Sequence, residues 1–335
     1  MKPEILIRAD GNPLIGLGHL VRCSALAHML KDDFNITFIC KNIPDPMLAK
    51  LNNNGFNCCK IEIENEFISR LNDNTIAVLD GYHFDIGYQK QVKATGSKLV
   101  CIDDLHDKEF LADLIINHAP GITIQDYKAQ PYTQFALGLD FALLRPAFLK
   151  QAKKERKIDK IETVLICFGG SDYYNLTDST LRVIMGFGQF RKIIVVTGSA
   201  YKHVDSLNAM IKADHRIVCH HDLDSKQMIS LMVESSLAIV PCSSILLELF
   251  TVGVPTITGF YVDNQREASK TICEIGLALN CENMFLNYNE KLNSHLDTIS
   301  CLNGNQMVQK QKAIIWKGSK VYLKLFKSIY NEVFK

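Results

Sequence analysis

Residues 4–27 read EILIRADGNPLIGLGHLVRCSALA, and this stretch decides the fold class. Its first part, from Ile5 to Arg8, is a short apolar run of the kind that forms a buried strand, and its last part is rich in Leu and Ala, which favour a helix. Glycines lie between the two, at Gly16 and Gly18. A buried strand, a glycine-bearing loop and a helix begin a βαβ unit, so the sequence predicts a parallel sheet covered by helices.

The same alternation of short apolar runs and segments of helical periodicity continues along the chain. We expect strands at residues 5–8, 36–40, 58–61, 75–80, 98–103, 114–117, 163–168, 192–196, 217–219, 237–241 and 256–260. Segment 150–160 is polar with alternating charge, which fits a linker, although a solvated helix is an equal alternative. The sequence therefore predicts two doubly wound α/β domains, 1–149 and 161–335, with a terminal helix over 306–334 in the second.

The composition excludes several classes of protein. The 335 residues include 37 Lys and Arg against 36 Asp and Glu, so binding driven by charge to nucleic acid or to an anionic membrane is not expected. The start of the chain is too polar for a signal peptide, and no apolar run reaches the ~20 residues that cross a bilayer. The 11 cysteines are odd in number and form no C-x-x-C motif, which favours reduced thiols. We therefore expect a soluble cytoplasmic protein without membrane insertion.

The first strand-to-helix loop suggests a ligand site, because glycines let a ligand approach the backbone closely. A nicotinamide-binding loop would have the pattern G-x-G-x-x-G. Gly16 and Gly18 fit it, but its third glycine position holds Val21. No acidic residue closes the second strand, where a ribose contact belongs. Dinucleotide binding is therefore disfavoured.

The same loop places His19 at the start of a helix. The positive end of a helix dipole favours the neutral form of an imidazole, which can act as a general base. Arg22 lies one turn further on the same helix face, and Asp10 could orient the imidazole from the loop. A histidine that only caps or packs at the helix start explains the same spacing. The spacing alone supports the two interpretations equally.

Acidic and aromatic residues follow two further strands of the first half. Asp80 and Tyr82 end the fourth strand, and Asp103 and Asp104 end the fifth. Strand ends form the rim of the ligand site in such sheets, so Tyr82 could hydrogen-bond a substrate or a catalytic water. A metal site at the adjacent aspartates is the weaker interpretation, because neighbours on a strand point to opposite faces. Other histidines lack ligand spacing and are expected to be structural or at the surface: His118, His203, His215, His220, His221 and His295.

The second half contains two strand-to-helix turns that suit an anion. Residues 168–172, FGGSD, resemble a phosphate cradle without the lysine of a Walker loop. Residues 241–244, PCSS, place two hydroxyls at a helix start, and Glu248 lies one turn inside. Such an arrangement fits a nucleoside diphosphate, with the carboxylate on the ribose hydroxyls. Ordinary helix caps and a surface glutamate explain the same residues.

Taken together, these motifs resemble a known family. Between Arg8 and Gln265 the motifs occur in this order: RAD, IGLGHLVRCSALA, DGY, IDD, LGLDFALLRPAF, FGGSD with NLT, SS with LE, GVP and DNQ. They are similar to the nucleotide-sugar hydrolases of the pseudaminic acid pathway. The resemblance implies the GT-B fold, two Rossmann-like domains facing across a cleft. It implies release of UDP and free sugar from UDP-2,4-diacetamido-2,4,6-trideoxy-β-L-altropyranose, without a cofactor, for cell-surface glycans such as those on flagellin.

The resemblance also assigns roles to residues by position. His19 would be the catalytic histidine, with Tyr82 and Asn264 as active-site partners. Glu248 would bind the ribose. The diphosphate would lie against Gly169, Gly170, Ser171, Ser243 and Ser244. Further substrate contacts are expected at Asp10, Gly16, Gly18, Arg22 and Gln265.

The chemistry of the residues agrees with a single displacement in which His19 activates a water and the anomeric carbon inverts. Helix starts and hydroxyls can hold the diphosphate, so no metal is required. The expected partners are a UDP-sugar substrate and the UDP product, with the protein a monomer. The alternative is a glycosyltransferase, in which the same base deprotonates an acceptor hydroxyl. A nucleotide-sugar-binding protein without catalysis is the third possibility.

Overall fold

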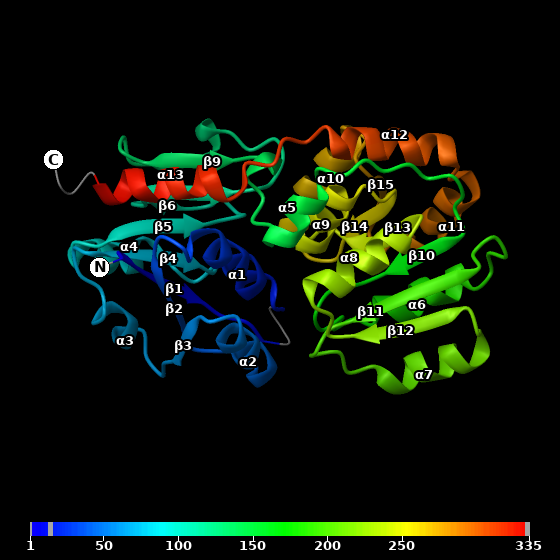
Figure 1. The fold of residues 1–335 in the computed structure, drawn as a ribbon, viewed down its shortest axis with the longest axis horizontal. Helices are drawn as coiled ribbons and strands as arrows, with labels where there is room; N and C mark the ends of the chain where they lie inside the picture. The colour runs from blue at the N-terminus through cyan, green and yellow to red at the C-terminus, as the bar shows by residue number, and fades with distance from the viewer. Residues whose placement is uncertain (1, 13–15, 332–335) are drawn as a thin grey trace. The chain divides into compact units, whose positions relative to one another are not determined.

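The computed structural model describes residues 2–12 and 16–331, with the side chain of residue 331 not included. Residues 13–15 of the predicted first loop and 332–334 of the predicted terminal helix lie outside this range. The chain divides into two units, Met1–Pro146 with Trp316–Lys335, and Ala147–Ile315. Each unit contains one large parallel sheet with helices, as the alternating pattern predicted (Figure 1).

Unit 1 has a seven-stranded parallel sheet in the order β3-β2-β1-β4-β5-β7-β9. Its strands are β1 (Glu4–Ala9), β2 (Asn35–Cys40), β3 (Asn57–Lys60), β4 (Thr75–Asp80), β5 (Lys98–Ile102), β7 (Leu114–Asn117) and β9 (Gln134–Leu137). A separate parallel pair joins β6 (Glu109–Phe110) to β8 (Lys128–Ala129). The other elements are α1 (Gly18–Leu30), α2 (Asp45–Asn53), α3 (Asn65–Ile68), α4 (Ile86–Ala94), α13 (Gly318–Asn331), η1 (Ile124–Asp126) and η2 (Leu139–Phe141). Because β1 and β4 are neighbours, the loops that follow Ala9 and Asp80 start side by side.

Unit 2 has a six-stranded parallel sheet in the order β12-β11-β10-β13-β14-β15. Its strands are β10 (Thr163–Ile166), β11 (Lys192–Thr197), β12 (Ile217–His221), β13 (Leu237–Pro241), β14 (Thr256–Phe260) and β15 (Leu279–Asn283). Its other elements are α6 (Leu176–Ile184), α7 (Val204–Ala213), α8 (Ser225–Glu234), α9 (Ser244–Val252), η3 (Asp263–Gln265), α10 (Arg266–Glu274), α11 (Tyr288–Thr298) and α12 (Cys301–Lys312). The central β10 and β13 are buried along almost their whole length, as expected for strands covered on both faces.

Segment 150–160 is not a free linker. Its first residues belong to α5 (Pro146–Gln151), and the remainder packs on unit 2. Arg156 donates to the backbone carbonyls of Val233 and Ser235, and the Asn305 side chain bonds both backbone groups of Ile158. The charges predicted an exposed segment, but they could not indicate that Arg156 and Ile158 tie it to unit 2.

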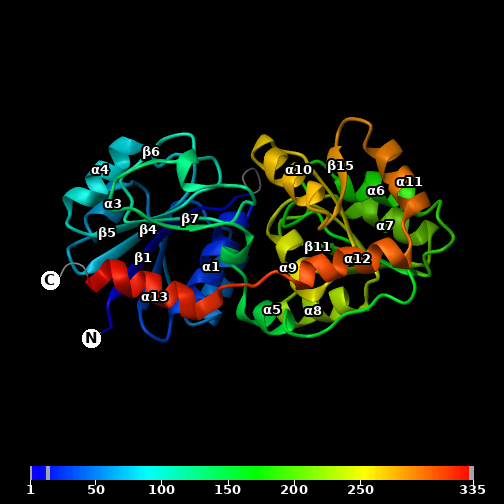
Figure 2. The ribbon, with the colours of Figure 1, turned by 90° about the horizontal axis from the view of Figure 1, so that it is seen from above.

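The helix predicted over 306–334 is two helices, α12 and α13, separated by residues 313–317 (Figure 2). The sequence placed this region in the second domain, but α13 belongs to unit 1. There Tyr322 and Phe326 are fully buried, and Phe326 meets Phe34 edge to face at 6.2 Å between ring centroids. Lys327 also pairs with Asp33 at 2.6 Å. Periodicity identified the apolar face of this helix but could not indicate which domain covers it.

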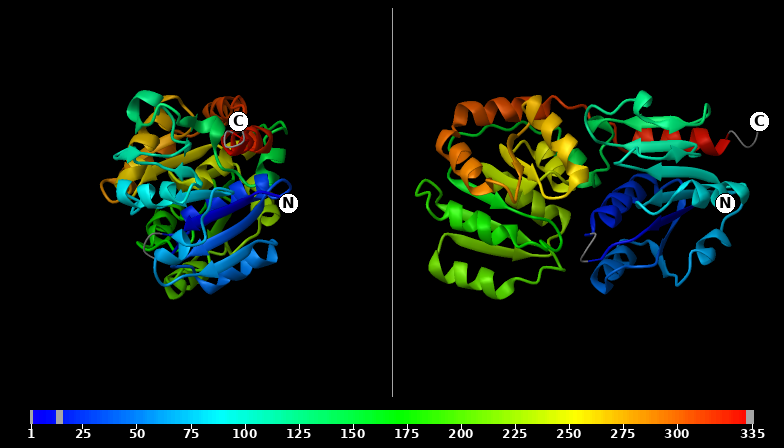
Figure 3. Two further views of the ribbon diagram at one scale, coloured as in Figure 1. Left: turned by 90° about the vertical axis from the view of Figure 1, so that its left-hand side faces the viewer. Right: turned by 180° about the vertical axis from the view of Figure 1, so that it is seen from behind.

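The C-terminal helix lies with the strands of unit 1 in the right-hand view of Figure 3, where it is red among strands coloured blue to green. Within the described residues, no helix is both long and apolar enough to span a membrane.

Candidate active site

The clearest cluster of functional groups lies where α1 begins and β4 ends. His19 is in the first turn of α1 and Asp80 is the last residue of β4. The imidazole Nδ1 lies 2.6 Å from Asp80 Oδ1, and both side chains are almost fully buried. No residue of the described part of the chain hydrogen-bonds the other ring nitrogen, Nε2. The structure therefore fixes the ring through one nitrogen and leaves the other available.

Arg22 holds the Asp80 carboxylate in place. Its Nε donates to Asp80 Oδ2 at 2.7 Å and its Nη2 to Oδ1 at 2.5 Å, while Nη1 donates to Asp104 Oδ2 at 3.1 Å. Burial alone would raise the pKa of Asp80, but the nearby Arg22 charge and His19 outweigh it and hold this pKa far below its usual value. Arg22 Nη2 also lies 3.0 Å from His19 Nδ1. Because Nη2 donates to Asp80 Oδ1 and an ionised carboxylate can only accept, we assign the hydrogen on Nδ1 of His19 to the contact with Asp80. In the neutral ring, Nε2 then has the lone pair that a general base needs.

Tyr82 contacts the imidazole through its ring. Its ring meets that of His19 edge to face, with 5.1 Å between centroids, and its hydroxyl donates to Asp104 Oδ2 at 3.2 Å. Burial and the Asp104 charge raise the pKa of Tyr82, so the hydroxyl keeps its proton. The ring is 43% exposed. Tyr82 is therefore a hydrogen-bond donor to Asp104 at the edge of the cluster, while its contact with a substrate or a catalytic water stays a prediction.

Asp10 does not orient the imidazole. Its Oδ1 accepts from the backbone N–H groups of Lys41 and Asn42 at 2.7 and 2.8 Å, and its Oδ2 accepts from Arg8 at 2.8 Å. Asp10 thus ties the loop after β1 to the loop after β2, and Asp80 takes the role expected for it. Sequence reasoning placed Asp80 on the rim but missed this role, because Asp10 is closer to His19 along the chain.

The buried Arg8 supports this loop. It is fully buried, donates to both carboxylate oxygens of Glu64 at 3.0 and 2.7 Å, and lies 5.5 Å from the centre of the Phe84 ring. Tyr88 donates to the same Glu64 carboxylate at 2.8 Å. Arg8 fixes Asp10, and Asp10 in turn fixes the start of the glycine loop.

The two predicted loop glycines differ in what they provide. Gly16 has φ +77°, a conformation that residues with a side chain rarely adopt. Its backbone N–H donates to the carbonyl of Asn12 at 2.8 Å, which closes the loop on itself. Among the described residues, no atom that could obstruct a Cβ atom at Gly16 or Gly18 lies within 4 Å of it, so these residues leave space beside both glycines. That space is compatible with the predicted substrate contacts.

In unit 2, the predicted phosphate cradle at α6 is already capped. The Asp172 carboxylate accepts from the backbone N–H groups of Leu176 and Thr177 at 2.8 and 2.9 Å. The preceding turn packs closely on the loop after β11, where Ala200 N donates to the Gly170 carbonyl at 3.2 Å. An anion at the α6 amides would have to displace a carboxylate of the protein itself. The cradle interpretation of α6 is therefore wrong, while contacts from Gly169, Gly170 and Ser171 stay a prediction.

The start of α9 is different. Ser243 is its N-cap, yet the Ser243 side chain makes no capping hydrogen bond. Ser244 is the first residue of α9, and Glu248 is buried one turn further along. The uncapped amides and the positive helix end suit an anion, so α9 fits the diphosphate better than α6 does.

Asn264 and Gln265 lie in η3, which begins three residues after the end of β14. Both side chains are partly buried, and Gln265 Oε1 accepts from the backbone N–H of Tyr261 at 3.4 Å. They lie at the same carboxyl-end edge of the unit 2 sheet as the start of α9, because β13 and β14 are parallel neighbours. The structure therefore groups the second-half candidates along one sheet edge, and the first-half candidates along the corresponding edge in unit 1.

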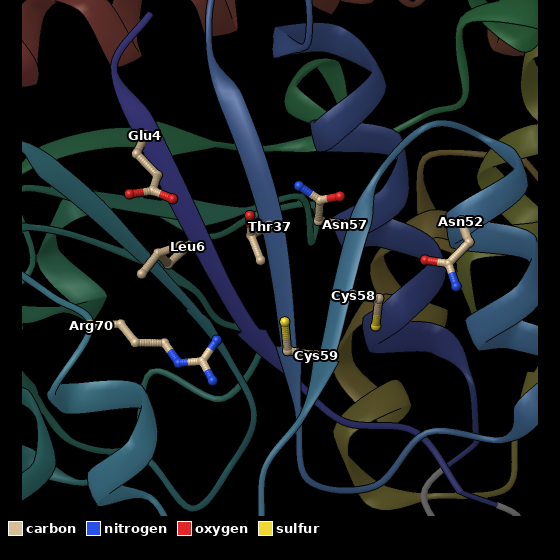
Figure 4. A pocket seen from close by; sticks show the side chains of 8 residues that line it. All are labelled: Glu4, Leu6, Thr37, Asn52, Asn57, Cys58, Cys59 and Arg70. Carbon is tan, nitrogen blue, oxygen red and sulfur yellow. The ribbon is translucent and has the colours of Figure 1, made fainter.

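A hollow of about 460 Å³ lies elsewhere in unit 1, at the strand surfaces away from the carboxyl ends of β1 and β4 (Figure 4). It is lined by Glu4, Leu6, Thr37, Asn52, Asn57, Cys58, Cys59 and Arg70. Neither His19 nor Asp80 lines it, so this hollow is separate from the predicted site.

Comparison with known proteins gives relatives in sequence and in structure. The chain is 28% identical over 286 residues to the spore coat polysaccharide biosynthesis protein SpsG of Bacillus subtilis, covering 82% of each protein. It is 26% identical over 279 residues to an uncharacterized protein of Methanocaldococcus jannaschii, covering 79% of this chain and 57% of that longer relative. No protein-family model matches the chain.

Solved structures resemble the whole chain. MurG of Acinetobacter baumannii superposes with a TM-score of 0.67 at 13% identity, covering 97% of this chain and 99% of MurG. The calicheamicin glycosyltransferase CalG4 superposes with a TM-score of 0.66 at 12% identity, covering 100% of both chains. The fold is therefore GT-B, with two Rossmann-like α/β units and a C-terminal helix, as the sequence resemblance implied.

Proposed function

We propose that this protein hydrolyses a UDP-linked diacetamido-trideoxy hexose at the anomeric carbon, with inversion, in the biosynthesis of pseudaminic acid. The observation that carries the proposal is the 2.6 Å contact between His19 Nδ1 and Asp80 Oδ1, which leaves Nε2 as the basic nitrogen. The motif resemblance supplies the substrate. The relationship to a protein of spore coat polysaccharide biosynthesis supports a role in making glycans.

His19 acts as the general base. Its Nε2 takes a proton from a water molecule, and the water oxygen forms a bond to the anomeric carbon. The bond from that carbon to the UDP oxygen breaks, and its electron pair leaves with UDP. The positive charge that develops on the imidazole is stabilised by the Asp80 carboxylate, whose low pKa keeps it ionised throughout. Single displacement gives the free sugar in the inverted configuration.

Arg22 and Tyr82 position the groups around the base. Arg22 bonds Asp80 through two nitrogens and so sets the direction of its Oδ1 towards His19. The Tyr82 hydroxyl lies next to the imidazole and donates its hydrogen to Asp104, and its oxygen accepts a hydrogen bond from the sugar when substrate binds. Asn264 contributes a second polar contact to the sugar.

Unit 2 binds the nucleotide in this proposal. The uncapped start of α9, with Ser243 and Ser244, stabilises the charge on the departing diphosphate. Glu248 accepts from the ribose hydroxyls. The remaining nucleotide contacts come from Gly169, Gly170, Ser171 and Gln265. These groups can carry the diphosphate charge without a metal.

A glycosyltransferase is the second candidate, because CalG4, named as a glycosyltransferase, shares this fold over the full chain. The same base would then deprotonate an acceptor hydroxyl. The two functions differ in what happens when no acceptor is present.

The experiment incubates the full-length protein with the UDP-diacetamido-trideoxy hexose and a chelator, without acceptor, and follows UDP release. We expect equal amounts of UDP and free sugar from wild type. His19→Gln should lose turnover yet bind UDP with unchanged affinity, because the base and the nucleotide contacts are in different units. Binding of the intact substrate without UDP release would favour the transferase. Loss of UDP binding in His19→Gln would contradict the assignment of roles.

A further inference from the structure

The ends of two neighbouring strands place Asp104 beside His118. Strands β5 and β7 are parallel and pair Ile102 with Ile116, and the backbone N–H of Asp103 donates to the Ile116 carbonyl at 2.9 Å. Asp104 and His118 each lie two residues beyond that pair. Adjacent strands are about 5 Å apart, so these two residues start from neighbouring backbone positions.

The residues just before them point to the other side. Asp103 accepts from the Tyr127 hydroxyl at 3.0 Å, and the Asn117 amide donates to the same hydroxyl at 2.8 Å. Asp104 and His118 are the next residues along the chain, just beyond the ends of β5 and β7, and no hydrogen bond joins either of them to Tyr127 in the described part of the chain. Asp104 Oδ2 instead accepts from Arg22 and Tyr82 in the candidate active site.

Two atoms of this pair are buried without a hydrogen-bond partner in the described part of the chain, Asp104 Oδ1 and His118 Nδ1. Such atoms are uncommon, because burying a polar group without a partner destabilises the protein. Asp104 uses its other oxygen for Arg22 and Tyr82, so Oδ1 is an acceptor that the protein itself leaves unused. Their place next to the proposed base suggests that a ligand completes both.

The chemistry of the pair is one acceptor and one donor. Burial, followed by the nearby Arg22 charge, lowers the pKa of His118 to about 4, so its ring is neutral at pH 7. A neutral imidazole with its hydrogen on Nδ1 donates from that atom, while a carboxylate oxygen accepts. A secondary amide presents one N–H and one C=O, which match these two groups. A hydroxyl can also donate and accept, but only through one oxygen atom, whereas an amide does so through two separate atoms and can span a wider pair of partners.

We propose that Asp104 and His118 form a subsite for an amide substituent on the sugar, with Asp104 Oδ1 accepting the amide N–H and His118 Nδ1 donating to the amide carbonyl. This inference rests on the proposed function, since the amide belongs to the sugar of the nucleotide sugar. It assigns to unit 1 the selection of N-acylated sugars. It also gives His118, which the sequence indicated as structural or at the surface, a direct contact with substrate.

The test is calorimetric titration of the full-length protein with three probes: UDP, UDP-glucose and UDP-N-acetylglucosamine. The last two differ only in a hydroxyl or an acetamido group at one carbon. Wild type should bind UDP-N-acetylglucosamine about tenfold more tightly than UDP-glucose, as expected for hydrogen bonds that include a charged acceptor.

Asp104→Asn is the sharpest variant. Arg22 and Tyr82 both donate to the Oδ2 position, so the asparagine oxygen must stay there and its NH₂ group takes the Oδ1 position. A donor then faces the amide N–H, and the preference for the acetamido sugar should disappear. Asp107→Asn is the matched control, because it removes an exposed carboxylate from the same loop. It should keep the preference.

Two variants of His118 separate recognition from folding. His118→Asn places an NH₂ donor near the Nδ1 position and should keep most of the preference, while His118→Leu should lose it. Thermal unfolding identifies any variant that is not folded. If UDP binds but wild type does not distinguish the two sugars, or if His118→Leu still does, the subsite is wrong. If UDP itself does not bind, the proposed function is wrong, and the subsite proposal that rests on it is wrong as well.

Discussion

The proposed base depends on the Asp80 carboxylate, and Asp80→Asn removes its charge with little change in size. The carboxylate accepts from His19 Nδ1 at 2.6 Å and from Arg22 Nε and Nη2 at 2.7 and 2.5 Å. Asparagine has a single oxygen, so its NH₂ group must face either the imidazole or the guanidinium, both of which donate. The ring then loses the partner that fixes its tautomer, or Arg22 loses half of its pairing.

Two magnitudes follow for Asp80→Asn. General-base catalysis contributes about 10²- to 10⁴-fold, so we expect kcat to fall by this factor. Removing one partner of a buried ion pair costs about 3–5 kcal/mol. Arg22 keeps its bond to Asp104, so the free energy of unfolding should fall by about 3 kcal/mol, at the lower end of that range.

The assay is UDP release under saturating substrate, corrected for the folded fraction measured by urea unfolding. Asp113→Asn is the control. Asp113 is buried in the same unit and accepts from Lys93 Nζ and from the Leu99 backbone N–H, each at 2.7 Å, but it precedes β7 and lies away from His19. It should lose stability and keep kcat. If Asp80→Asn retains kcat within about threefold of wild type, well below the usual general-base contribution, the reasoning is refuted.

Three further predictions concern pH, the nucleotide and the C-terminal helix. The pKa of Asp80 is lower in the folded protein than in the unfolded chain, so its carboxylate stabilises the fold fully above the unfolded pKa. This stabilisation disappears as the pH falls through the folded pKa. In urea unfolding, the free energies of unfolding of wild type and Asp80→Asn should therefore converge below about pH 4. Asp172→Ala should lower the free energy of unfolding by about 1 kcal/mol, as expected when a helix cap is lost. Titration should show that UDP binds as tightly as to wild type. A large loss of UDP affinity would mean that the start of α6 does bind the diphosphate. Phe326→Ala should cost about 3–5 kcal/mol in urea unfolding, because this ring is fully buried in unit 1, and a loss below 1 kcal/mol would contradict the packing of α13.

Most strands were predictable from sequence, including the edge strands β3 and β12, but β9, β15, β6 and β8 were not. β9 reads QFAL and β15 reads LNCEN, both at an edge of their sheets. An edge strand needs less apolar surface than a central one, so its sequence gives a weaker signal. The two-residue strands β6 and β8 are too short for any periodicity. The division of the last region into α12 and α13 depends on tertiary packing rather than on local pattern.

The candidate site was predictable where chemistry follows a strand or begins a helix. His19 and Tyr82 were chosen in this way, and the structure brings their rings together. The partner of His19 was not predictable, because Asp80 is 61 residues away in sequence while Asp10 lies in the same loop. The phosphate site predicted at α6 was wrong for a different reason. The carboxylate that caps this helix, Asp172, is part of the same motif that suggested the phosphate site.

Hydrolysis in H₂¹⁸O followed by mass spectrometry and proton NMR tests the central claim most directly. The claim is that water, activated by His19, attacks the anomeric carbon. It predicts that ¹⁸O appears in the free sugar and none in UDP, and that the first anomer observed is inverted. Label in the UDP phosphate would mean attack at phosphorus, and a retained anomer would mean a covalent intermediate; either result would contradict the account.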